Sequence, residues 1–195
     1  MSFVQPVSLS YHQVHLEPLN LQHEQGLKEA CQDGELWKLR ITSTPSPETV
    51  REYIELALQQ REQGTRFAFA VIDERTGKVI GTTSYHDIVP QINRLEIGYT
   101  WYAKSAQRTH INTTCKFLLL RHAFENLNAN VVGLRTDNFN FASQKAIERL
   151  GAKKDGVLRQ HAIRKDGTIR DTVMYSIIQS EWVNVKAHLL YLLDR

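Results

Sequence analysis

Hydrophobic and polar positions follow two different periods along the chain, and the change of period separates predicted strands from predicted helices. In the run YHQVHLEPL, Val14 and Leu16 alternate with polar residues, as expected for a strand with one buried face. Two similar runs flank the turn sequence ERTGK, and two more flank Asp166-Gly167, so each pair is predicted to be an antiparallel hairpin. With LEIGYTWYA and VVGLRT, the chain has about seven predicted strands.

Helical spacing recurs between these strands. The predicted helices cover residues 20–32, 44–64, 113–128, 140–151 and 180–193. In the second of them, Ser46 can act as the N-cap, Pro47 suits the first helical position and Gly64 ends the pattern. Ser180 is a similar cap candidate for the last helix.

The order of these elements predicts an α/β (α+β) fold of one domain over residues 1–195. Most strands are joined by hairpins, which predicts a mixed, mostly antiparallel sheet flanked by helices. A dinucleotide-binding Rossmann fold is excluded, because no Gly-x-Gly-x-x-Gly follows the first strand. In LEIGYTWYA, the alternation predicts that Leu95, Ile97, Tyr99 and Trp101 share one face and that Glu96 lies on the other.

Composition and charge narrow the class of protein. Lys and Arg exceed Asp and Glu by 24 to 21 without forming a basic run, so neither nucleic acid nor a lipid surface is an expected partner. No apolar stretch approaches the roughly 20 residues of a membrane span, and the amino end lacks a signal-peptide pattern. Because Cys31 and Cys115 lack metal-binding spacing, we expect no metal site and a cytoplasmic protein.

The stretch SAQRTHINTTCK, residues 105–116, lies between a predicted strand and a predicted helix. The first turn of a helix has up to four backbone N–H groups without intrahelical partners, next to the positive end of the helix dipole. An anionic phosphate fits such a position. Many helix starts bind nothing, so this stretch alone is only weak evidence of a phosphate site.

Several motifs, in this order, resemble the GCN5-related N-acetyltransferases, and within them the branch of ribosomal-protein alanine acetyltransferases. They are EIGYTW (96–101), QRTHINT (107–113), NFASQKAIERLGA (140–152) and DGVLRQH (155–161) ahead of DGTIRDTVMYSI. The resemblance extends over roughly residues 11–182 and implies an enzyme that moves acetyl from acetyl-CoA to a primary amine. It also implies that the strands LEIGYTWYA and VVGLRT splay apart, so that the pantetheine arm lies between them.

The resemblance further implies which residues hold acetyl-CoA. Irregular pairing of the first of these strands is expected to expose amides for the thioester carbonyl, and amides of the loop and helix start to bind the pyrophosphate. An asparagine at the next helix start, here Asn140, is expected to contact pantetheine. The predicted cofactor-binding residues are Tyr99, Thr100, Trp101, Gln107, Arg108, Thr109, His110, Ile111, Asn112, Thr113 and Asn140.

At residue 110 the chain departs from the family's loop pattern. That pattern usually has Gln or Arg, two residues, Gly, one residue, and then Gly or Ala; here Gln107 opens it, and His110 and Asn112 occupy the small positions. Three interpretations stay open: His110 faces outward, donates to a phosphate oxygen, or narrows the site. The histidine also removes the access to positive φ that glycine would give.

Acetyl transfer to an amine needs a group that takes a proton from the ammonium and a group that protonates the departing thiolate. Glu96 is the predicted base; the alternative is a sheet carboxylate satisfied by a cross-strand arginine. Ser143 is the predicted acid, because the matching serine of the ribosomal branch has been assigned that role. The alternative is that Asn140 is a simple N-cap and Ser143 a solvated hydroxyl.

Other side chains are weaker candidates. Tyr175 is an alternative acid, and His86 and His161 are alternative bases. Cys115, in the first turn after the loop, is expected to have a lowered thiol pKa without acting as a nucleophile. Trp37 and Trp101 either line an acceptor pocket or fill the core.

The acceptor amine is the least determined part of this interpretation. A protein or peptide α-amine is favoured, a small-molecule amine is the alternative, and a degenerate relative that binds CoA or a protein partner without turnover is a third possibility. Residues 34–47 and 86–93, which would select the acceptor, carry mixed charge and do not discriminate. The leucines of the last helix permit either a homodimer contact or packing on the sheet; these are Leu189, Leu190, Leu192 and Leu193.

Overall fold

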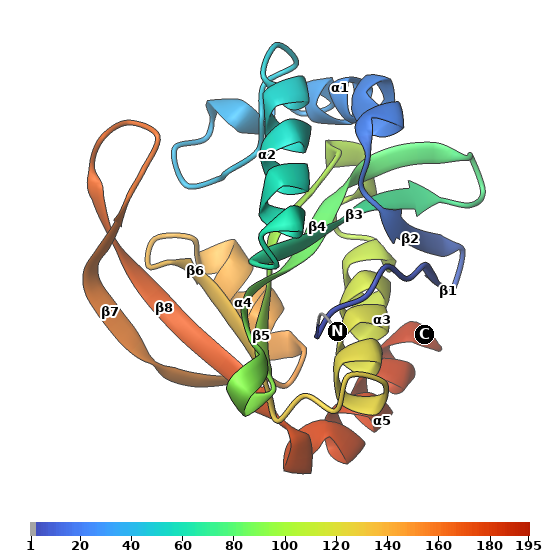
Figure 1. Cartoon of the computed structure of the whole chain (residues 1–195), viewed down its shortest axis with the longest axis vertical. Helices are drawn as coiled ribbons and strands as arrows, with labels where there is room; N and C mark the ends of the chain where they lie inside the picture. The colour runs from blue at the N-terminus through green and yellow to red at the C-terminus, as the bar shows by residue number, and fades with distance from the viewer. Residues whose placement is uncertain (1–2) are drawn as a thin grey trace.

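The computed structural model describes residues 3–195 and is organised around one eight-stranded sheet (Figure 1). The strand order is β1-β2-β3-β4-β5-β6-β8-β7, and every neighbouring pair is antiparallel except β5 and β6. The predicted mixed, mostly antiparallel sheet is confirmed. Its strands are β1 (Leu9–Tyr11), β2 (Val14–Pro18), β3 (Arg66–Asp73), β4 (Lys78–Val89), β5 (Arg94–Tyr102), β6 (Val131–Asp137), β7 (Lys153–Ile163) and β8 (Ile169–Ile178).

Helices cover both faces of this sheet (Figure 1). They are α1 (Glu24–Gln32), α2 (Val50–Glu62), α3 (Ile111–Glu125), α4 (Phe141–Arg149) and α5 (Trp182–Leu193). Tyr53 of α2 bonds to Thr82 of β4, whereas Tyr85 of the same strand donates to the Leu119 carbonyl of α3. Residues 82 and 85 are an odd number apart on β4, so α2 and α3 pack on opposite faces.

Helix α3 is surrounded by protein. Twelve of its residues are buried, so this helix is covered nearly all round. Helix α5 packs against it, with the rings of Phe124 and Trp182 stacked 5.3 Å apart. Leu189 and Leu193 of α5 are buried inside the chain. Within residues 3–195, no helix combines the length and apolarity needed to cross a membrane.

The helices begin or end a few residues from their predicted limits, and the sheet has one strand more than predicted. Residues 47–49 form a turn, closed by the Ser46 N–H donating to Thr49 Oγ1 and the Thr49 N–H donating to the Ser46 carbonyl, so α2 begins three residues late. Ser180 does not cap α5, because it lies inside the 3₁₀ turn Gln179–Glu181 and Glu181 is the residue that directly precedes the helix. The eighth strand, β1, is only three residues long, too short to show an alternating pattern.

The predicted alternation along β5 is wrong beyond residue 98. Thr82 pairs with Trp101 and Ser84 with Gly98, so one β4 residue stands opposite two β5 residues, which is a β-bulge. Tyr99 at the bulge has φ 48°, in the left-handed region. The extra residue moves Trp101 to the α2 face, where its ring lies 6.5 Å from that of Tyr53.

Candidate active site

Strands β5 and β6 pair at one end and part at the other. Their parallel register ends at Glu96 opposite Gly133, although β5 continues to Tyr102 and β6 to Asp137. The splayed central pair implied by the family resemblance is therefore present in the fold. The facing edges of the two strands beyond Glu96 and Gly133 are left open to an extended ligand.

A group of backbone amides lies at the end of β5, around the start of α3. The Thr109 hydroxyl donates to the Ala106 carbonyl and accepts the Ile111 N–H, and Gln107 donates to the Tyr102 carbonyl, which together fix the loop. Among the described residues, these five backbone N–H groups make no hydrogen bond: Arg108, Thr109, His110, Asn112 and Thr113. Unpaired amides at a helix start suit the pyrophosphate of CoA, so this loop fits the predicted ligand.

The backbone at His110 does not need glycine. His110 has φ −65° and ψ −20°, which any residue adopts; the left-handed position of the loop is Arg108, at φ 59°. The expected penalty for a histidine at residue 110 is thus wrong. Arg75 and, to a smaller extent, His110 hold the pKa of the Asp73 carboxyl below its usual range, which places the imidazole near the β3–β4 turn.

Glu96 lies in a buried network of charged groups. Its Oε2 accepts from Arg135 Nε at 2.7 Å and its Oε1 from Arg94 at 3.2 Å, and only 3% of the residue is exposed. Arg135 also contacts Asp87 and lies 3.4 Å from Nδ1 of His86. The ligand atoms of His86, Asp87 and Glu96 lie within 4.8 Å of one another, but a guanidinium already contacts all three groups. The Glu96 carboxylate is therefore bonded to arginines, as the alternative interpretation of this residue expected.

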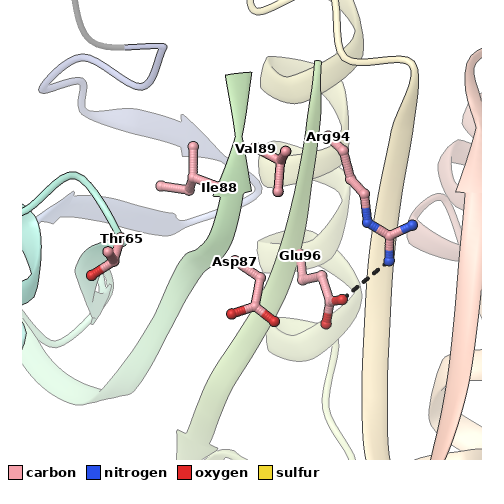
Figure 2. Close-up of a pocket in the computed structure, with 6 residues that line it drawn as sticks. All are labelled: Thr65, Asp87, Ile88, Val89, Arg94 and Glu96. Carbon is pink, nitrogen blue, oxygen red and sulfur yellow. Dashed lines mark hydrogen bonds and ion pairs between the residues drawn. The ribbon is translucent and has the colours of Figure 1, made fainter. Parts of the chain in front are cut away.

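A pocket of about 360 Å³ opens beside Glu96. Figure 2 shows the Asp87 and Glu96 carboxylates on neighbouring strands, with the Arg94 guanidinium bonded to Glu96. Thr65, Ile88 and Val89 complete the lining. Glu96 is thus tied to two arginines and also faces a space that an acceptor could enter.

His86 is a poorer base than Glu96. Burial, assisted by Arg135, lowers the pKa of His86 to about 4, so the ring is neutral at pH 7. Arginine can only donate, so Nδ1 must accept from Arg135 and the remaining proton is on Nε2. Nε2 lies over Gly98, where a Cβ would be 2.3 Å away. The lone pair of His86 Nδ1, which a base would need, therefore already accepts from Arg135.

Asn140 and Ser143 lie together at the start of α4. Asn140 Oδ1 accepts the Ser143 N–H at 3.1 Å, so Asn140 is the N-cap. Both residues are partly exposed, and within residues 3–195 no hydrogen bond joins the Ser143 hydroxyl to another group. Glu96 lies on β5 and Ser143 on α4, and in the described part of the chain no hydrogen bond joins the two side chains.

The structure shows where the weaker candidates lie and corrects the prediction for Cys115. Burial raises the pKa of Cys115 to about 11, opposite to the predicted lowering, because the thiol lies in the core rather than at the helix end. Tyr175 is buried beneath α4 and donates to Glu148, and burial raises its pKa to about 12. His161 lies 3.1 Å from the Thr172 hydroxyl on the β7–β8 hairpin. Trp101 is buried, whereas Trp37 lines a second pocket of about 430 Å³.

Arg135 and Asp87 were missed by the sequence analysis. Arg135 is two residues beyond Gly133 on β6, so strand alternation alone places it on the face of Glu96. Gly133 leaves room for Glu96, since a Cβ at Gly133 would lie 2.7 Å from the glutamate Cγ. The glycine and the arginine two residues later were thus a readable signal in VVGLRT.

Comparison with known proteins agrees with this geometry. A family model described as "Acetyltransferase (GNAT) domain" matches residues 13–153. The "Uncharacterized N-acetyltransferase p20" of Bacillus licheniformis is 26% identical over 168 residues, which are 86% of this chain and 93% of the relative. The "Putative ribosomal N-acetyltransferase YdaF" of Bacillus subtilis is 34% identical over 56% of this chain and 59% of its own length.

A solved structure is similar over nearly the whole chain. The crystal structure of a putative acetyltransferase from T. thermophilus is 34% identical, covers 97% of this chain and 98% of its own, and has a TM-score of 0.84. The splayed strands, the unpaired amides at α3 and the family match all indicate the same chemistry. The chain belongs to the GCN5-related N-acetyltransferase family and is an acetyl-CoA-dependent N-acetyltransferase.

Proposed function

We propose that the enzyme acetylates the α-amine of a protein or peptide by direct attack of the amine on acetyl-CoA. The observation that carries the donor half is the group of five unpaired amides beside the open edge of β5. The acceptor half is supported by the pocket beside Glu96 and by the word "ribosomal" in the name of the Bacillus subtilis relative. A small-molecule amine is the second candidate, because the pocket of about 360 Å³ would also admit one.

The chain's own groups divide the chemistry between them. Glu96 takes the proton of the ammonium, directly or through a water in the pocket, and frees the nitrogen lone pair. Backbone N–H groups at the β5 bulge meet the thioester carbonyl where negative charge develops. As the carbon–sulfur bond breaks, Ser143 gives its proton to the thiolate and regains one from solvent. Acetyl-CoA supplies the activated acetyl group, and we propose no metal.

We also propose the domain organisation, the cellular location and the surface available for a dimer. We assign all of residues 1–195 to one domain, since a single sheet runs from Leu9 to Ile178. Both cysteines are free thiols, which supports a cytoplasmic site of action. A homodimer through α5 would have to use its exposed side, where Val183 and Tyr191 lie.

Two measurements test this function. Heat unfolding with acetyl-CoA at a hundred times its dissociation constant should show about 2.7 kcal/mol of added stability. Thiol release is then followed with peptides that have a free N-terminus, the same peptides with a blocked N-terminus and a free lysine, and small amines. Release only with free N-termini supports the proposal. Stabilisation without release from any amine would support a binding protein instead.

A further inference from the structure

The β5 bulge has a backbone shape that its surroundings must hold. Thr83 of β4 alone stands opposite Tyr99 and Thr100, and Tyr99 has a positive φ that a tyrosine rarely adopts. Conformations of this kind persist only where neighbouring groups fix them. The contacts of the bulge therefore bear on how its N–H groups are aimed.

Threonine hydroxyls bind the carbonyl on each side of this residue. Thr82 Oγ1 donates to the Tyr99 carbonyl at 3.2 Å, and Thr100 Oγ1 donates to the Gly98 carbonyl at 3.3 Å. A trans peptide group is planar, so its N–H points opposite to its C=O. Because the Tyr99 carbonyl is directed to Thr82 on β4, the Thr100 N–H is directed away from β4, toward the edge where β6 has parted.

Each hydroxyl is in turn set by a cation, one on each face of the sheet. Lys116 of α3 donates to Thr100 Oγ1 at 2.7 Å. On the other face, Arg66 donates to the Tyr53 hydroxyl at 2.8 Å, and that hydroxyl lies 2.8 Å from Thr82 Oγ1. A cation can only donate, so Thr100 Oγ1 accepts from Lys116, and Tyr53, which accepts from Arg66, has its proton free for Thr82 Oγ1. Thr100 Oγ1 also lies 2.8 Å from the Thr83 hydroxyl, which can donate to it and leave the Thr100 proton for the Gly98 carbonyl.

Neither cation is explained by an ion pair. Arg66 is 2% and Lys116 5% exposed, and in the described part of the chain neither has a carboxylate within ion-pair distance. Burial lowers the pKa of Lys116 to about 8, which records the penalty of placing this charge in the core. A buried cation bonded only to neutral groups is rare, and an apolar residue of the same size would remove the penalty.

We propose that Lys116, acting through Thr100, is a positioning residue that holds the β5 bulge so that its N–H meets the thioester carbonyl. Arg66, acting through Tyr53 and Thr82, holds the bulge in the same way from the opposite face. This inference rests on the proposed role of the bulge amides. The inference adds two chains of hydrogen bonds, from Lys116 through Thr100 and from Arg66 through Tyr53 and Thr82, which fix the direction of the bulge amides.

The test compares Lys116→Met, Thr100→Val and the double variant with the parent enzyme. His122→Leu is the matched control, because it removes another buried polar group of α3, and its Nε2 has no hydrogen-bond partner among residues 3–195. Three quantities are measured: kcat for thiol release, the acetyl-CoA dissociation constant, and the ¹³C shift of carbonyl-labelled acetyl-CoA when bound. The last reports hydrogen bonding to the carbonyl without requiring an acceptor.

We expect each single variant to lower kcat about tenfold while the dissociation constant changes less than about threefold. The carbonyl shift should move toward its value in free acetyl-CoA. The double variant should be no slower than either single one, because both remove the same chain. The control should keep the parent's kcat and carbonyl shift.

The proposal is overturned if Lys116→Met keeps the parent's kcat and carbonyl shift, if the two losses multiply in the double variant, or if His122→Leu loses as much. The carbonyl shift separates this result from the proposed function. A parent that releases no thiol with any amine, but whose carbonyl shift is lost in Lys116→Met, refutes the acetyl transfer and supports the positioning.

Discussion

The two sides of the cleft are made from different parts of the chain. The proposed donor side consists of backbone groups, namely the five unpaired amides within residues 108–113 and the open edge of β5. The proposed acceptor side consists of charged side chains, with Glu96 held by two arginines beside His86 and Asp87. A backbone site tolerates an unusual side chain such as His110, whereas a side-chain network fails when one member is changed. Substitutions on the two sides should therefore have unequal effects.

Glu96→Gln should have the largest effect. It removes the proposed base and leaves Arg135 and Arg94 facing a neutral amide, so we expect kcat to fall on the order of a thousandfold. The acetyl-CoA dissociation constant should stay within about threefold, since the donor side is unchanged. Glu17→Gln is the matched control, because Glu17 also pairs with a buried group, His23, but far from the cleft along the sheet. Comparable loss in both variants would contradict a catalytic role.

His86 should make stability depend on pH. Its folded pKa of about 4 lies below the usual 6.5, so the unfolded chain binds a proton more readily between these values. Stability is therefore fully present above pH 6.5 and falls as the pH drops toward 4, by up to about 3 kcal/mol from this group. Urea unfolding at pH 7 and 4.5 should show a smaller fall in His86→Gln than in the parent. An equal fall would show that His86 is not buried as described.

Ser143→Ala tests the acid on the donor side. We expect kcat to fall about tenfold, because the departing thiolate loses its proton donor while the amides still hold acetyl-CoA. Steady-state thiol release measures this, with Ser176→Ala as a control whose hydroxyl bonds to Asp155 instead. An unchanged kcat in Ser143→Ala would contradict the role of acid and favour the alternative, in which Ser143 is only a solvated hydroxyl in the first turn of α4.

His110→Gly should have the smallest effect. Because the backbone at residue 110 has helical angles and the amides provide the binding, we expect the acetyl-CoA dissociation constant to change less than about threefold. An unchanged constant, measured by calorimetry, means that the imidazole neither contacts nor obstructs the cofactor. A tenfold change in either direction would show that the donor side also depends on a side chain.

The sequence predicted the elements well and their irregularities poorly. The period of the pattern gave the order of strands and helices, since burial of one face imposes it. It failed at Tyr99, where one extra residue reverses the face of everything that follows. It also failed at Cys115, since a helix that is buried nearly all round gives no sign in its own residues of how deeply each one lies.

The sequence by itself determined the mixed sheet, because local periodicity encodes the order of strands and helices. It also offered the loop before α3 as a phosphate site and Glu96 as a base, while Ser143 became a candidate only through the family resemblance. Only the tertiary structure decided that Arg135 and Arg94 hold Glu96, that His86 has no free lone pair, and that Lys116 and Arg66 reach the bulge from opposite faces. These contacts join residues far apart in the chain. Their distances follow from the register of β4, β5 and β6 and from the packing of α2 and α3, which no local pattern specifies.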